Sequence, residues 1–88
     1  DELLNISGVD ASFLLFTAGT GVNISARSMG EVNVQVIMES LGGGGHLTMA
    51  AAQLPEITME ETRQRLREAI DSYFEANPRQ GTPPAGTN

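Results

Sequence analysis

The stretch Leu41-Gly42-Gly43-Gly44-Gly45-His46 organises the rest of the chain. Four consecutive glycines lose more conformational entropy on folding than ordinary loop residues, so something requires a bare backbone here. Such a run can adopt positive φ and can let the oxygens of a ligand approach main-chain N–H groups, forming an anion-binding concavity. A flexible linker is the alternative, but linkers of this kind are Gly/Ser mixtures in polar sequence. Apolar segments flank this run, at residues 34–41 and 47–54, which favours an ordered loop over a linker.

The composition indicates one small globular domain. The chain has 88 residues, of which 40% are hydrophobic and 18% charged, a size that allows a modest core. It has no cysteine, which leaves no disulfide framework or thiolate metal site and fits a reducing compartment. No segment resembles a signal peptide, and no apolar run is long enough to span a bilayer. Because the chain begins at Asp1 without an initiator methionine, we expect an excised domain of a longer parent.

The distribution of charge argues against binding to a polyanion. The net charge is −6, whereas contact with many phosphates requires a basic face. The chain contains no lysine, and Arg27 is the only permanent positive charge before Arg63. A single arginine in an acidic half suits one or two phosphates, so no polymeric nucleic acid is expected as a partner.

The first half of the chain predicts a β-hairpin. Residues 3–8 are expected to be the end of a helix, or a lead-in, closed at Gly8. Residues 11–17 form a short apolar run that predicts a buried strand, and residues 22–26 alternate as a strand with one buried face. Glycines at 19 and 21 predict a turn between them. We therefore expect these two strands to pair antiparallel.

Residues 28–42 are ambiguous by periodicity, since the valines alternate as in a strand while other apolar residues follow a helical spacing. The flanks favour a helix, because Ser28 and Glu31 match a capping box and Gly42 is placed as a C′ glycine. Such a helix would put Arg27 and Ser28 beside a helix N-terminus, where an anion is favoured. Residues 50–54 predict a third strand, which ends at Pro55.

Residues 58–76 form the most clearly predicted helix. Thr58 and Glu61 match a capping box, Glu61 and Arg65 are spaced as an ion pair, and Asn77-Pro78 ends the helix. One apolar stripe should pack on the sheet: Met59, Leu66, Ile70, Tyr73 and Phe74. The domain is therefore predicted over residues 1–76, with residues 77–88 as a disordered tail.

Few residues suit catalysis. His46 is the only histidine, so it makes no metal site by itself, and no nucleophile with a base and an orienting acid can be assembled. The acids of the C-terminal helix indicate a solvated face: Glu60, Glu61, Glu68, Asp71 and Glu75. We therefore expect no catalytic residue and no metal or other cofactor in this domain, which should hydrolyse nothing alone.

An anion-binding pocket is better supported. Arg27 can hold a phosphate through a bidentate guanidinium, Ser25 and Ser28 can donate hydroxyls, and residues 42–45 can donate backbone N–H groups to it. His46 can hydrogen-bond a phosphate oxygen. Each has a structural alternative: an ion pair with Glu31 for Arg27, an N-cap for Ser28, and an ordinary loop position for His46. Their concentration in one unit favours the pocket.

These residues resemble a known family. The segment Ile24-Ser25-Ala26-Arg27-Ser28, followed by Asn33 and by Gly42-Gly43-Gly44-Gly45-His46, is similar to the DHHA1 domain of the DHH phosphoesterase superfamily. Residues 25–52 are closest to the GdpP/YybT-type membrane-anchored cyclic-di-AMP phosphodiesterases. The resemblance covers about residues 3–73 and leaves the tail unmatched.

The resemblance implies a two-lobed parent enzyme. A separate DHH domain would hold two manganese ions and activate water, while this domain clamps a cyclic dinucleotide across the cleft; no Asp-His-His motif occurs here. Arg27, Ser25 and Ser28 would hold the phosphate or sugar, with the glycine run close beneath. His46 would contact the scissile phosphate or its neighbour, and Asn33 is a further candidate.

We therefore predict an α/β domain, a small mixed β-sheet with at least two packed helices, that forms the substrate-binding lobe of a phosphodiesterase opening cyclic di-AMP to linear pApA. It would be a cytoplasmic domain of a parent anchored in the cell membrane. Two alternatives stay open: a clamp domain for short oligonucleotides or single-stranded nucleic acid, and a noncatalytic nucleotide-binding module.

Overall fold

The structure, a computed structural model, describes residues 1–78, so most of the predicted tail lies outside the described residues. The described elements are β1 (Glu2–Asn5), β2 (Ala11–Ala18), β3 (Gly21–Ser28), α1 (Val34–Glu39), β4 (Gly44–Gly45), β5 (Met49–Leu54) and α2 (Met59–Ala76). They confirm the predicted small α/β fold with two helices. The strands form one sheet in the order β1-β2-β3-β5-β4, and where a mixed sheet was expected, the four pairings are all antiparallel.

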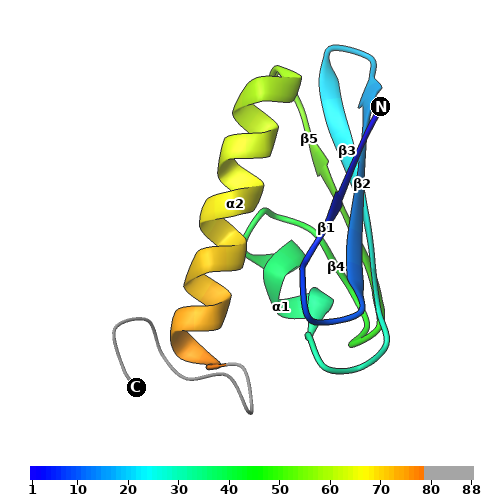
Figure 1. The fold of residues 1–88 in the computed structure, drawn as a ribbon. Helices are drawn as coiled ribbons and strands as arrows, with labels where there is room; N and C mark the ends of the chain where they lie inside the picture. The colour runs from blue at the N-terminus through cyan, green and yellow to red at the C-terminus, as the bar shows by residue number, and fades with distance from the viewer. Residues whose placement is uncertain (79–88) are drawn as a thin grey trace.

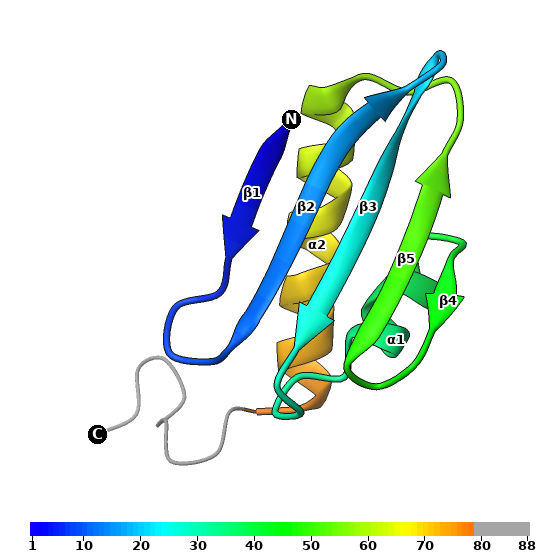
Figure 2. The same cartoon turned by 90° about the vertical axis from the view of Figure 1, so that its right-hand side faces the viewer.

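The two helices lie on the same face of the sheet. Figure 1 shows α1 and α2 on one side of the strands, and Figure 2 looks onto the opposite side, with α2 behind the strands. We call this opposite side the open face, because none of the described helices covers it. Residues 1–78 therefore form two layers, and within them only one face of the sheet is buried.

Alternation along the strands decides which side chains face the helices. Over residues 11–15 of β2, 22–28 of β3 and 49–54 of β5 every second residue is buried, and the apolar ones among them meet apolar side chains of both helices in one core. Burial of this apolar surface is the main stabilising term for so small a domain. The strands contribute Ala11, Phe13, Leu15, Val22, Ile24, Ala26, Ala50, Ala52 and Leu54, and the helices contribute Val34, Ile37, Met38, Leu66 and Ile70.

The predicted hairpin, third strand and long helix are confirmed. β2 pairs with β3 from Ala11↔Ser28 to Ala18↔Gly21, with Gly19 in the turn at φ 60°. The capping box of α2 is also present, since the Thr58 hydroxyl accepts from the Glu61 N–H at 3.1 Å. Asn77 caps the other end of the helix.

Of the two alternatives for residues 3–8, the end of a helix was wrong. Instead of ending a helix, residues 2–5 form the edge strand β1, which pairs with β2 through Leu3↔Leu14 and Leu4↔Phe13. The segment is too short for its period to be read from the sequence, and it becomes a strand because β2 offers an unpaired edge.

The predicted start of the first helix was also wrong. Ser28 does not cap a helix, because β3 continues through it and its N–H donates to the carbonyl oxygen of Thr48 at 3.0 Å. α1 begins at Val34 instead, with Asn33 as the N-cap whose Oδ1 accepts from the Gln35 N–H at 3.1 Å. The strand pairing thus overrides the local capping signal. Gly42, predicted as the C′ residue, instead lies two residues beyond the C-cap Ser40, at φ 86°.

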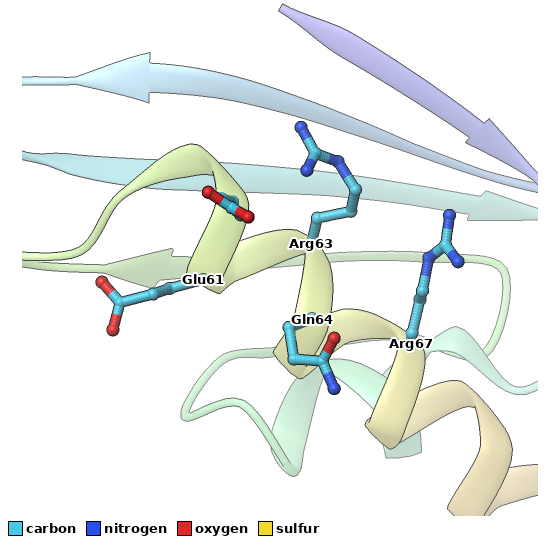
Figure 3. A pocket seen from close by; sticks show the side chains of 5 residues that line it. Glu61, Arg63, Gln64 and Arg67 are labelled. Atoms are coloured by element: carbon cyan, nitrogen blue, oxygen red, sulfur yellow. The ribbon is translucent and has the colours of Figure 1, made fainter.

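One ion pair joins α2 to the edge of the sheet. The Arg63 guanidinium donates to the Glu2 carboxylate at 2.5 and 2.7 Å, and this hydrogen bond lowers the pKa of Glu2. The expected Glu61–Arg65 pair is absent from the residues described, where Arg63–Glu2 is the ion pair found. Figure 3 shows Arg63 and Arg67 extending from the same side of α2. Both line an open hollow of about 550 Å³.

Replacing the N-cap of α2 should destabilise the chain. Thr58→Ala removes the oxygen that accepts the Glu61 N–H, so we expect the free energy of unfolding to fall by about 1 kcal/mol. Ser72→Ala, at an exposed position inside the same helix, is the matched control and should change stability only slightly, in the opposite direction. Urea denaturation of both variants measures the difference; equal effects would contradict the role of the cap.

Candidate functional site

The register of the sheet places several of the predicted binding residues in two adjacent rows on the open face. In the first row, Arg27 of β3 is opposite Met49 of β5. Met49 in turn exchanges backbone hydrogen bonds with His46, at 2.7 and 3.3 Å. Because neighbouring strands are about 4.8 Å apart, the backbones of Arg27 and His46 are separated by roughly 10 Å.

The second row lies about 7 Å further along the strands, two residues away in β3. It contains Ser25 of β3, Ala51 of β5 and Gly44 of β4, which are paired in that order across the sheet. The two rows therefore bring Arg27, Ser25, His46 and part of the glycine run to one surface. Long-range strand pairing achieves this, since β3 is separated from β4 and β5 by α1.

Arg27 carries an unpaired positive charge on this face. Its side chain is exposed, and within residues 1–78 it makes no ion pair with Glu31 or any other acid. The surface ion pair considered as an alternative is therefore not formed. A guanidinium with all its donors available is suited to bidentate recognition of a phosphate.

His46 lies in the tight turn that joins β4 to β5. Its backbone N–H donates to the Met49 carbonyl oxygen at 2.7 Å, so that group is already used within the turn. The residue itself is exposed. What His46 can offer to a ligand is therefore its imidazole, as donor or acceptor.

Two of the predicted binding residues lie away from these rows. Ser28 is buried on the helix side of β3, and its hydroxyl accepts from the Gly30 N–H at 3.0 Å. Asn33 caps α1, and its own N–H donates to the Tyr73 hydroxyl at 2.9 Å. Both residues therefore hold local structure, and the sheet does not bring them beside Arg27.

Three of the four consecutive glycines have a structural reason to be glycine. Gly42 lies at φ 86°, where a side chain is strained. A Cβ on Gly43 would lie 2.1 Å from the carbonyl oxygen of Ala51, and one on Gly45 would lie 2.5 Å from the Cα of Ala50. The run is bare mainly because it packs directly on β5.

Gly44 is different from its three neighbours. A Cβ there would meet nothing within 4 Å, and its backbone is not at positive φ. The described fold thus gives no steric reason for glycine at the position that faces Ala51 and Ser25 on the open face. The N–H groups of Gly42 and Gly43 are bound to the end of α1, donating to Glu39 and Met38 at 3.0 and 2.8 Å.

Met49 was missed in the sequence analysis. It is 51% exposed and stands between Arg27 and His46 in their row. Only the position three residues after His46, across a tight turn, could have indicated this placement. Its flexible thioether gives the row an apolar centre between two polar ends.

Other features of the described part of the chain lie apart from these rows. Among residues 1–78, no three side chains that could ligate a metal come together. Within the same residues, no helix has the length and the apolar character that crossing a membrane requires. The hollow in Figure 3 is lined by α2 and contains none of the predicted binding residues.

The chain belongs to the family of DHHA1 domains, whose model matches residues 1–76. This confirms the resemblance inferred from residues 24–28, Asn33 and residues 42–46. The chain is 66% identical over 76 residues to the cyclic-di-AMP phosphodiesterase GdpP of Geobacillus thermodenitrificans. It is 58% identical over 76 residues to the protein of the same name from Bacillus subtilis. Both matches cover 85% of this chain but only 12% of the relative.

A more distant relative has a different name. The chain is 37% identical over 65 residues to the bifunctional oligoribonuclease and PAP phosphatase NrnA of Thermus thermophilus, covering 74% of this chain and 20% of that protein. The chain thus spans a small part of each of these enzymes. These matches establish the family of this chain. They do not assign to it the activities for which the full-length relatives are named.

Two neighbouring glycines should respond to alanine in opposite directions. Gly43→Ala forces a Cβ against the backbone of β5, so we expect a loss of about 1–3 kcal/mol in the free energy of unfolding. Gly44→Ala enters open space and should stabilise the chain by about 0.4–1 kcal/mol, because alanine restricts the unfolded state. Thermal denaturation of the two variants tests this. Stabilisation by both would indicate that the run is an unconstrained linker.

Proposed function

We propose that this domain is the substrate-binding lobe of a phosphodiesterase that hydrolyses cyclic di-AMP to linear pApA. The observation that carries the proposal is the guanidinium of Arg27, which has no acidic partner among residues 1–78 and lies in one row with His46 on the open face. The names of the relatives at 66% and 58% identity support the choice of substrate.

The spacing of the polar groups suits a ligand with two phosphates. Arg27 would bind one phosphodiester through paired N–H donors, and His46, roughly 10 Å away along the row, would bind the other. Ser25 offers a hydroxyl two residues from Arg27 on the same strand, one row along, where a ribose or a phosphate oxygen would lie. A cyclic dinucleotide has two phosphodiesters held at a fixed separation, which pairs naturally with two anchors on a rigid sheet.

The absence of a side chain at Gly44 would let the ligand approach the backbone. In the proposal the sugar-phosphate ring of the substrate passes over Gly44 and Ala51, the small residues of the second row. This gives Gly44 a functional reason where the fold supplies no steric one. Met49 would contact the apolar face of the ribose or base.

The chemical step is assigned to another part of the parent. We propose that a DHH domain of the same parent chain faces the open face and holds two manganese ions, which would activate the attacking water. The role of the residues described here is to hold the dinucleotide in place for that attack. The proposal includes a parent that is anchored in the cell membrane, with this domain on the cytoplasmic side.

A clamp for short oligonucleotides is the second candidate. The similarity to NrnA favours it. The same Arg27 would then hold a terminal phosphate or one backbone phosphate of a linear strand. The noncatalytic nucleotide-binding module also remains a candidate, and it differs from both in predicting no turnover by the parent.

Arg27→Ala should impair the parent enzyme and leave the fold intact. Loss of a charged hydrogen bond costs about 1.5–3 kcal/mol, so kcat/KM for cyclic di-AMP should fall by roughly ten- to a hundredfold. Arg65→Ala, an exposed arginine on α2, is the matched control and should leave kcat/KM unchanged. Assays on the full-length protein should include linear pApA, since an oligonucleotide clamp would prefer it. An unchanged kcat/KM for Arg27→Ala would refute the phosphate-binding role.

Gly44→Ala should separate substrate binding from stability. The variant should fold at least as well as wild type, because its Cβ enters open space. A methyl group beneath the ligand should nevertheless raise KM for cyclic di-AMP by about tenfold, the equivalent of an overpacking cost near 1.4 kcal/mol. Steady-state kinetics of the full-length protein, with a melting curve for the same sample, gives both quantities. An unaltered KM would remove Gly44 from the substrate path.

A further inference from the structure

A third row on the open face carries side chains suited to a nucleobase. Phe16 of β2 is paired with Asn23 of β3, and Asn23 is paired with Gln53 of β5. Each alternates with buried core residues along its strand, so all three belong to the open face. Phe16 and Asn23 are half-buried and Gln53 is exposed. The row thus joins one aromatic ring to two carboxamides.

The two carboxamides have no side-chain partners within residues 1–78. No hydrogen bond to the amide of Asn23 or Gln53 is formed there, although directly paired residues have Cβ atoms only about 5 Å apart. The pair lines an open hollow of about 400 Å³, together with Ala18, Leu54 and Pro55. Donors and acceptors beside a hollow are therefore available to a ligand.

The chemistry of this row favours adenine. A carboxamide presents a carbonyl acceptor next to an N–H donor, which matches the N6 amino group and N7 of adenine. Guanine presents two acceptors at the same edge, and these are best met by arginine or lysine. The row contains neither. The ring of Phe16 adds a face against which a base can stack.

We propose that the Phe16–Asn23–Gln53 row binds the base of the substrate and makes the domain prefer adenine over guanine. This inference rests on the proposed function for the position of the phosphate. Arg27, Ser25 and Asn23 follow one another at every second residue of β3, so roughly 13 Å of strand separates the first from the last. The rows then occur in the order of a nucleotide: phosphate at Arg27, sugar at Ser25, base at Asn23.

Binding of two cyclic dinucleotides tests the base row. The full-length protein is titrated with cyclic di-AMP and with cyclic di-GMP in excess EDTA, so that hydrolysis does not interfere, and the ratio of the two Kd values is measured. Gln53→Glu keeps the shape of the side chain but replaces its N–H donor with an acceptor. It should weaken cyclic di-AMP binding about fivefold or more, and the preference for adenine should fall accordingly. Asn23→Ala should act in the same direction.

Two further variants make the test specific. Gln64→Ala makes a matched change on α2, away from the open face, and should leave both Kd values as they are. Phe16→Leu keeps apolar volume but removes the ring, so it should weaken both ligands without changing their ratio. Because Gln53 is exposed, its substitution should not disturb folding, which a melting curve verifies.

The outcomes distinguish the base row from the proposed function. An adenine preference that survives both Gln53→Glu and Asn23→Ala overturns the base row, even if Arg27→Ala still lowers kcat/KM as expected. A wild-type protein that binds the two dinucleotides equally, or binds neither, overturns it as well. If the protein fails to hydrolyse cyclic di-AMP with manganese present but loses its adenine preference in Gln53→Glu, the base row stands and the phosphodiesterase assignment fails.

Discussion

The close packing of the glycine run on β5 is the constraint on which the arrangement of the open face depends. Gly43 and Gly45 place their backbones so near to β5 that a Cβ on either would overlap Ala50 or Ala51. This contact fixes the register of β4 against β5. The register in turn places His46 opposite Met49 and Gly44 opposite Ala51. The glycine run, which in sequence suggests an anion-binding loop, therefore acts first by setting the positions of other residues.

The alternation of the strands then divides neighbouring residues between two roles. Arg27 and Ser28 are adjacent in β3, yet Arg27 is exposed on the open face while Ser28 is buried with the helices. The same rule puts Ser25 on the open face and Ala26 in the core. Because both helices cover one side, the core needs only half of each strand. The other half is available for binding without any loss of buried apolar surface.

The sequence predicted the parts of the fold that local signals determine. The hairpin turn at residues 19–21 and the capping box at Thr58 need no distant partner, and both are as expected. β1 was missed because a short edge strand is selected by the neighbour that it pairs with. The capping signal at Ser28 gave a wrong prediction because the Ser28 N–H donates to the carbonyl oxygen of Thr48, twenty residues later in the chain. This hydrogen bond keeps Ser28 in the sheet.

The same distinction holds for the candidate site. Arg27 and His46 could be predicted as binding residues from residue type alone, because Arg27 is the only arginine before Arg63 and His46 is the single histidine. The structure places both in one row of the sheet. Asn23 and Gln53 are ordinary polar strand residues in sequence. Their significance depends on a pairing across thirty residues, which no local pattern predicts.

The charge of the open face bears on the proposal that so acidic a domain binds an anion. The three rows contain Arg27 and no carboxylate, although the net charge of the chain is −6. Five of the acids lie on α2, which packs on the other face of the sheet: Glu60, Glu61, Glu68, Asp71 and Glu75. A packed layer is about 10 Å thick, and at physiological salt the Debye length is only about 8 Å, so much of their repulsion is screened at the open face. The local field there is set by Arg27, which favours a small anion while the overall charge disfavours a long one.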